Sequence, residues 1–93
     1  MSERAERIAA VLRDALDATH VEVADESHLH AGHAGARESD GGHFRAVIVS
    51  ERFEGLSRVA AQRIVFTALG DLMQREIHAF AMTTHTPEEW AAR

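Results

Sequence analysis

The chain has 93 residues, enough for one small domain with a single hydrophobic core and too few for two. Its net charge of −5 argues against strong electrostatic binding of nucleic acid, because neutralised phosphates supply most non-specific affinity. It has no cysteine, which excludes disulfides, a thiolate zinc site and a cysteine nucleophile. Histidine and carboxylate are then the side chains able to hold a transition metal.

The first predicted element is an amphipathic helix over residues 2–18. Its apolar residues recur at helical spacing, at Ile8, Val11, Leu12, Ala15 and Leu16. The stretch lacks the apolar core of a signal peptide, and no apolar run in the chain approaches the length of a membrane span. We therefore expect a cytoplasmic protein without a membrane partner.

Two strands and a polar segment follow. Residues 20–24 alternate apolar and polar side chains, as in a half-covered strand, and residues 43–49 are apolar on much of both faces. The second of these strands should be the central one, with Phe44, Ala46 and Ile48 on one face. The segment between them, about residues 28–42, is rich in glycine and is predicted to be an exposed, flexible loop.

The second half predicts a turn, a helix, a strand and a short helix. Phe53, in the turn over residues 50–57, should fill the core, and Ser57 should cap a helix over residues 58–75. The predicted core stripe of that helix is Val59, Phe66, Leu69 and Met73. The strand over residues 77–83 should place His78 on one face with Phe80 and Met82. A capping box, Thr86-Pro87-Glu88-Glu89, begins the last helix, which carries Trp90 as an expected lid on the core.

The order helix, strand, strand, helix, strand, helix predicts an α+β fold. Helices should cover a three-stranded sheet in a two-layer sandwich that forms one domain over residues 1–93. Periodicity supports this element order and leaves the strand order open. The chain lacks a nucleophile elbow and is small for a substrate pocket, so we do not expect an enzyme.

The densest group of chemically active side chains is the series His28-x-His30-x-x-His33. Neighbouring imidazoles are suitable ligands for zinc, copper or iron. A solvated loop whose histidines only titrate near neutral pH would have the same pattern. Spacing alone leaves both interpretations open.

The order of the motifs resembles the BolA-like family over roughly residues 8–90. These motifs are Asp25-Glu26-Ser27, the His-bearing loop, His43-Phe44, Val-Ser-x-x-Phe-x-Gly-Leu-Ser over residues 49–57, Ile77-His78-Ala79 and Thr86-Pro87-x-x-Trp90. The resemblance implies a fold related to the type II KH arrangement.

The same resemblance implies a function in iron–sulfur cluster trafficking or in iron or redox regulation. BolA-like proteins pair with monothiol glutaredoxins and share a bridging [2Fe–2S] cluster with them and with glutathione. The ligand positions match His30, with His33 as the next candidate, and His78 in the last strand. No cluster is expected on the isolated chain, which should be a monomer or a weak dimer.

The resemblance also implies an alternative function, a DNA-binding transcriptional regulator of stress response and cell morphology. The family's Arg-His-Arg triplet is replaced here by Ala61-Gln62-Arg63, so only Arg63 matches it. Arg52, Arg58 and Arg63 are predicted to form a local basic face. We expect weak, sequence-independent contact of this face with DNA.

Overall fold

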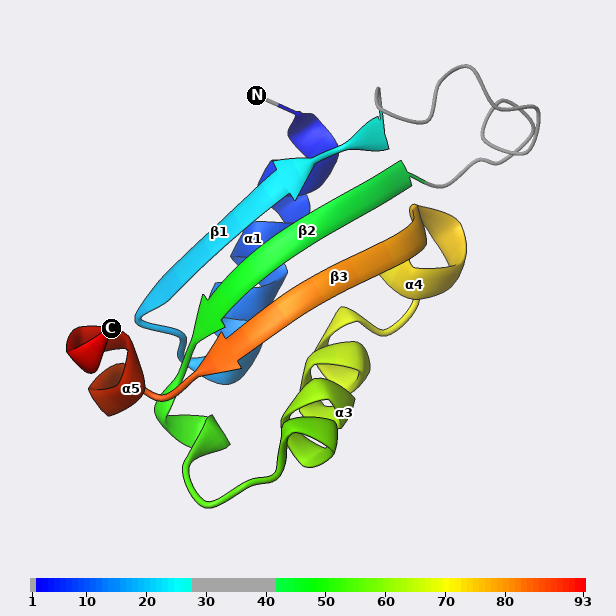
Figure 1. Cartoon of the computed structure of the whole chain (residues 1–93). Helices are drawn as coiled ribbons and strands as arrows, with labels where there is room; N and C mark the ends of the chain where they lie inside the picture. Colours follow the sequence, from blue (N-terminus) through cyan, green and yellow to red (C-terminus); the bar gives the residue numbers. More distant parts are fainter. Residues whose placement is uncertain (1, 28–41) are drawn as a thin grey trace.

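The computed structural model describes residues 2–27 and 42–93 and shows the expected α+β sandwich (Figure 1). The elements in chain order are α1 (Glu3–Leu16), β1 (His20–Asp25), β2 (Gly42–Val49), the 3-10 turn η2 (Glu51–Phe53), α3 (Arg58–Leu69), α4 (Leu72–Arg75), β3 (Ile77–His85) and α5 (Pro87–Ala92). The predicted order is confirmed, with one short turn and one short helix added to it.

The sheet has the strand order β1-β2-β3, so the prediction of a central second strand is confirmed. β1 runs antiparallel to β2, and β3 runs parallel to β2. Phe44, Ala46 and Ile48 alternate toward the core, and Ile48 is completely buried. β2 pairs with a strand on each side and is apolar on much of both faces. The other elements therefore pack around it.

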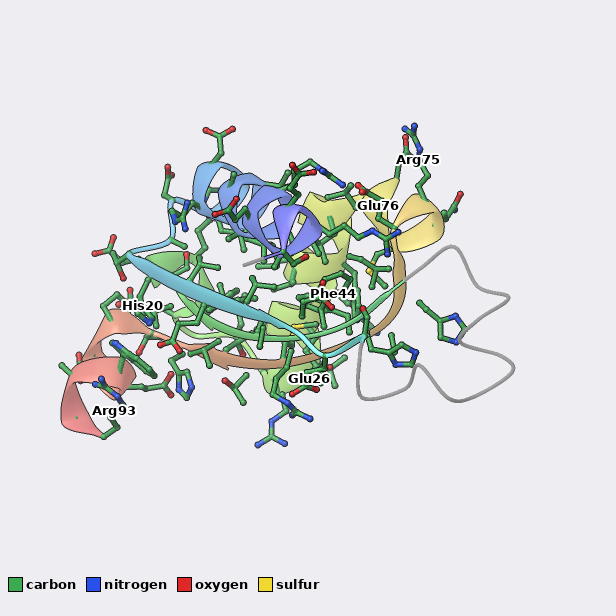
Figure 2. All side chains as sticks on the ribbon, turned by 90° about the horizontal axis from the view of Figure 1, so that it is seen from above. His20, Glu26, Phe44, Arg75, Glu76 and Arg93 are labelled. Carbon is green, nitrogen blue, oxygen red and sulfur yellow. The ribbon has the colours of Figure 1, made fainter. Side chains whose placement is uncertain are left out.

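One face of the sheet carries the hydrophobic core, which α1 and α3 close. Figure 2 shows α1 on one side of the strands, with Glu26 on the opposite side. The core cluster joins α1, β2, η2, α3 and the start of β3 through Ala5, Ile8, Leu12, Leu16, Phe44, Ala46, Ile48, Phe53, Ala61, Val65, Leu69 and Ile77. The prediction that Phe53 fills the core is confirmed.

The local start signals of the helices are also confirmed. The Ser57 hydroxyl accepts a hydrogen bond from the Ala60 N–H at 3.1 Å. At α5 the Thr86 hydroxyl accepts from the Glu89 N–H, and the Glu89 carboxylate accepts from the Thr86 N–H. These bonds satisfy N–H groups that have no partner within the first turn.

The predicted core stripe is wrong for Val59 and Phe66 and is confirmed for Leu69, which belongs to the core, and for Met73, which packs against it. Val59 and Phe66 are exposed, at 56% and 40%, whereas Ala61, Val65 and Leu69 face the core. The predicted and buried sets share Leu69, but the large side chains of Val59 and Phe66 favoured a stripe that is rotated away from the core. The buried stripe has a small residue, Ala61, where the helix packs close to its neighbours.

The predicted helix over residues 58–75 is in fact two helices. α3 ends at Leu69, and Gly70 has a φ of 51°, in the left-handed region that glycine adopts without strain. α4 begins two residues later and leads into β3. The break redirects the chain toward the start of the last strand.

Trp90 does not cover the core, contrary to prediction. Its ring stacks on His20, with centroids 5.0 Å apart, and lies 5.4 Å from the ring of His85. Both histidines pair with Val49 in the sheet, on the face opposite to that of Ile48. Trp90 therefore lies over the end of the outer sheet face, where Figure 2 shows α5 and its terminal Arg93 close to His20.

Candidate functional site

Three strand termini meet at one end of the sheet. β1 ends at Asp25, opposite Phe44 near the start of β2, and β3 starts at Ile77, opposite Gly42. The Gly42 N–H donates to the Glu76 carbonyl at 2.9 Å, and Arg7 of α1 pairs with the Glu76 carboxylate. The ends of β1, β2 and β3 lie side by side here (Figure 1).

A bulge at the start of β3 determines the orientation of His78. Gly42 pairs with Ile77, but the next residue, His43, pairs with Ala79, so His78 is an extra residue in the ladder. Such a bulge changes the direction of a side chain at the end of a strand. His78 is exposed beside His43, with the ring centroids 5.1 Å apart and the planes tilted by 46°.

The bulge corrects the predicted faces of β3. Ile77, Phe80 and Met82 contribute to the core or pack against it, whereas His78 and Ala79 are exposed. Strict alternation had grouped His78 with Phe80 and Met82. Because of the extra residue, the side chains after His78 point to the opposite faces from those predicted. His78 therefore lies away from the face that packs against the core.

His43 is the residue that sequence reasoning missed, since it was assigned only to the start of a strand. Its N–H donates to the Ser27 hydroxyl at 3.1 Å, and its carbonyl accepts from the Glu26 N–H at 2.7 Å. A Cβ on Gly42 would lie 2.5 Å from that hydroxyl and 2.9 Å from the Phe44 ring, so only glycine fits before His43. The pairing with His78 joins residues far apart in the sequence, and no local signal indicates it.

Asp25 and Ser27 stabilise the end of β1 next to this histidine pair. Burial acts to raise the pKa of Asp25, but hydrogen bonds from Ser2 and Ser27, together with the charge of Arg4, lower it below its ordinary value overall. A carboxyl whose pKa is lower in the folded state contributes stability above its unfolded pKa, and that stability is lost as the pH falls through the folded pKa. Asp25 is therefore a carboxylate at neutral pH.

The remaining predicted ligands, His30 and His33, lie outside the described residues, as does His28. Within residues 2–27 and 42–93, no group of three His, Cys, Asp or Glu side chains is placed to hold a metal ion. The pair His43 and His78 offers two imidazoles, which is an incomplete ligand set. A metal centre here needs further ligands.

The predicted basic face is divided in the structure. The Arg52 guanidinium pairs with the Asp17 carboxylate at 3.0 Å. Arg58 and Arg63 are exposed on α3, and five residues of α-helix turn the chain by about 500°, which places them roughly 140° apart around the axis. Their role in binding DNA or a partner stays a prediction.

The family model for "BolA-like protein" matches residues 12–89. The chain belongs to the BolA-like family. This membership agrees with the αββαβα order and with the sheet of β1, β2 and β3 described above.

Relatives of this BolA-like chain include both separate proteins and a domain of a larger one. It is 36% identical to the Escherichia coli DNA-binding transcriptional regulator BolA, over 91% of this chain and 77% of that protein. It is 38% identical to the Arabidopsis thaliana SufE-like protein 1, chloroplastic/mitochondrial, over 96% of this chain and 25% of that protein. The chain thus spans only a quarter of that relative's length.

Solved structures agree with the fold. The BolA domain of SufE1 from Arabidopsis thaliana superposes with a TM-score of 0.81 at 35% identity, covering 96% of this chain and 98% of that chain. The E. coli relative is named as a regulator. No helix in the described part of this BolA-like chain has the length and apolar character that crossing a membrane requires.

Proposed function

We propose that this BolA-like chain is the partner of a monothiol glutaredoxin and binds a bridging [2Fe–2S] cluster through histidines, in cluster trafficking or iron and redox regulation. The observation that carries the proposal is the placement of His78 at the end of the sheet, with its ring centroid 5.1 Å from that of His43. A histidine on a rigid strand, with its ring packed against a neighbouring imidazole, suits a ligand site that a second protein completes.

The chemistry of the available ligands fits a shared cluster. A chain without cysteine can contribute imidazoles to one iron, as in Rieske centres, while the other iron needs thiolates from elsewhere. The partner and glutathione would supply those thiolates. Histidine ligation gives a cluster a higher reduction potential than thiolates alone, and makes its release sensitive to protonation.

We assign different roles to the histidines. His78 is the ligand held by the sheet, and the second imidazole comes from His30, or from His33 in its absence. His43 acts as a positioning residue, because its ring lies against that of His78 and its backbone is bonded to Glu26 and Ser27. The sheet would thus hold one ligand in place before the partner binds.

The isolated chain should not retain a stable cluster, because it offers no thiolate ligands. The test is to reconstitute it with iron and sulfide, desalt it, and measure the visible spectrum and the iron content. The matched sample contains the monothiol glutaredoxin and glutathione and should keep its colour. A stoichiometric cluster that survives on the chain alone would contradict the proposal.

A second candidate function is DNA-binding transcriptional regulation, which the name of the E. coli relative favours. In this chain Arg58 and Arg63 are exposed, but Arg52 is paired with Asp17 and the net charge is −5. A divided basic surface on an acidic protein is a poor phosphate-binding face. These observations favour the glutaredoxin partnership.

We expect any DNA binding to be weak, independent of sequence and strongly reduced by salt, because neutralised phosphates release counterions. Fluorescence anisotropy with two unrelated duplexes, measured at low and physiological salt, tests this. An Arg58→Ala/Arg63→Ala variant should bind both duplexes more weakly to the same extent. Sub-micromolar binding of one duplex at physiological salt would instead support the regulator.

A further inference from the structure

A groove of about 660 Å³ lies between α1 and the outer edge of the sheet, on the side of β1 away from β2. Ala5 and Ala9 of α1 line it together with the half-buried Val21 and Val23 of β1. Ser2, at the start of α1, bonds to Asp25, at the end of β1, so helix and strand run in opposite directions. The groove therefore has small apolar residues in its centre and polar residues at both ends.

In the part of the chain that the structure describes, no strand pairs with the edge of β1 that lies along this groove. Glu26 and His43 form a hydrogen-bonded pair of the antiparallel ladder, so the alternating pattern also directs the N–H and C=O groups of Glu22 and Ala24 toward β2. The N–H and C=O groups of Val21, Val23 and Asp25 consequently point outward. β1 contains no proline and no lysine, two devices that keep an edge strand from pairing.

The charges at the two ends of the groove are opposite. Glu6 and Arg13 both line it and are seven residues apart on α1, about 10 Å along the axis. Within the described ranges, neither side chain takes part in an ion pair. Ala9 lies between them on the helix and also lines the groove. If a second copy of α1 ran antiparallel to the first, each acid would lie opposite a base, and the small residues would lie opposite each other.

We propose that this edge binds a second copy of the chain, with β1 antiparallel to the partner subunit's β1 across a two-fold axis. Val23 would lie opposite the partner subunit's Val23, which joins the two sheets into one of six strands. Glu6 would then face the partner subunit's Arg13, and Arg13 the partner subunit's Glu6. The predicted weak dimer thereby gains a specific interface.

The register follows from the outward-pointing residues. Antiparallel pairing through Val21, Val23 and Asp25 centres on Val23. A shift of the axis by one residue, to Glu22 or to Ala24, would place Glu22 opposite the partner subunit's Glu22 or opposite the partner subunit's Glu26. The repulsion of two carboxylates disfavours both shifted registers. The proposal does not rest on the proposed function, because His78 lies on β3, on the other side of β2.

Sedimentation velocity of the full chain over a range of concentrations should show a reversible monomer–dimer equilibrium. Glu6→Arg or Arg13→Glu alone should raise the dissociation constant by about tenfold or more, because two attractive pairs become repulsive. Mixing these two variants should restore dimers, and so should the double variant Glu6→Arg/Arg13→Glu. Glu54→Arg, the same charge change outside the groove, should behave as the unchanged chain does.

Hydrogen exchange at high and low protein concentration provides an independent measurement. The Val21 and Val23 N–H groups should be protected only at high concentration, since their partners are in the second copy. A chain that stays monomeric at millimolar concentration would overturn the proposal. The edge of β1 would then be available for pairing with a strand of another protein. Dimers that ignore both single charge changes, or that leave these two N–H groups unprotected, would also overturn it.

Discussion

His78→Ala is expected to abolish the visible circular dichroism of the complex between this chain and cluster-loaded monothiol glutaredoxin. The bulge in β3 exposes His78 at the sheet end, and this position offers the only imidazole of the last strand there. Visible circular dichroism reports the asymmetry of the ligand set. Titration of each variant with loaded glutaredoxin therefore measures the loss directly.

The other histidines should show graded effects in the same titration. His30→Ala should weaken the signal, because His33 can substitute for it, and the double change of His30 and His33 to alanine should match the loss seen with His78→Ala. His43→Phe should retain the signal better than His43→Ala, because phenylalanine keeps the ring packing and lacks a ligand nitrogen. Equal losses for both changes at His43 would make it a ligand instead.

Thermal unfolding and a pull-down without the cluster serve as controls for the His78 variant. The heterodimer should still form, because its contact surface would include α3 around Arg63 as well as the imidazoles. A His78→Ala complex with the unchanged spectrum and unchanged stability would show that His78 is not a ligand. The family resemblance would then fail at its most important position.

Ile48→Asp is expected to lower the free energy of unfolding by roughly 4 kcal/mol or more, through loss of buried apolar surface and burial of a carboxyl group. Ile48 is completely buried in the central strand and belongs to the cluster shared by both covering helices. A small domain has about 5–15 kcal/mol in total, so most of its stability would be lost. Urea denaturation followed by Trp90 fluorescence measures the change.

Val47→Asp is the matched control, since it makes the same kind of change one residue earlier in β2. Val47 is half-buried and lies outside the core cluster, on the outer face of the sheet. Its loss of stability should be clearly smaller than that of Ile48→Asp. If both variants unfold at the same urea concentration, the core does not lie on the face that we assign to it.

Features that depend on residues close together in the chain could be predicted before the structure was known. Alternating side chains predicted β1, apolar residues on both faces predicted the central place of β2, and side-chain caps predicted the starts of α3 and α5. The motif order indicated the family, which the family model confirmed. These predictions succeeded because strand period, helix caps and turn residues act within a few positions of each other.

Features that depend on residues far apart in the chain became visible in the folded structure. Two apolar stripes of α3 were possible, and packing against α1 and β3 buried the one with Ala61. Trp90 joined His20 and His85 at the sheet end instead of the core.

The candidate site also combines a feature that is local in the sequence with features that depend on distant residues. The resemblance marked His78 from its own short motif, but its orientation and its neighbour His43 follow from a bulge in the pairing of β2 with β3. A bulge is a mismatch between two strands, so the sequence of either strand alone does not show it. Within the described residues, the backbone edge of β1 is likewise open only because β2 pairs with β3 on its other side.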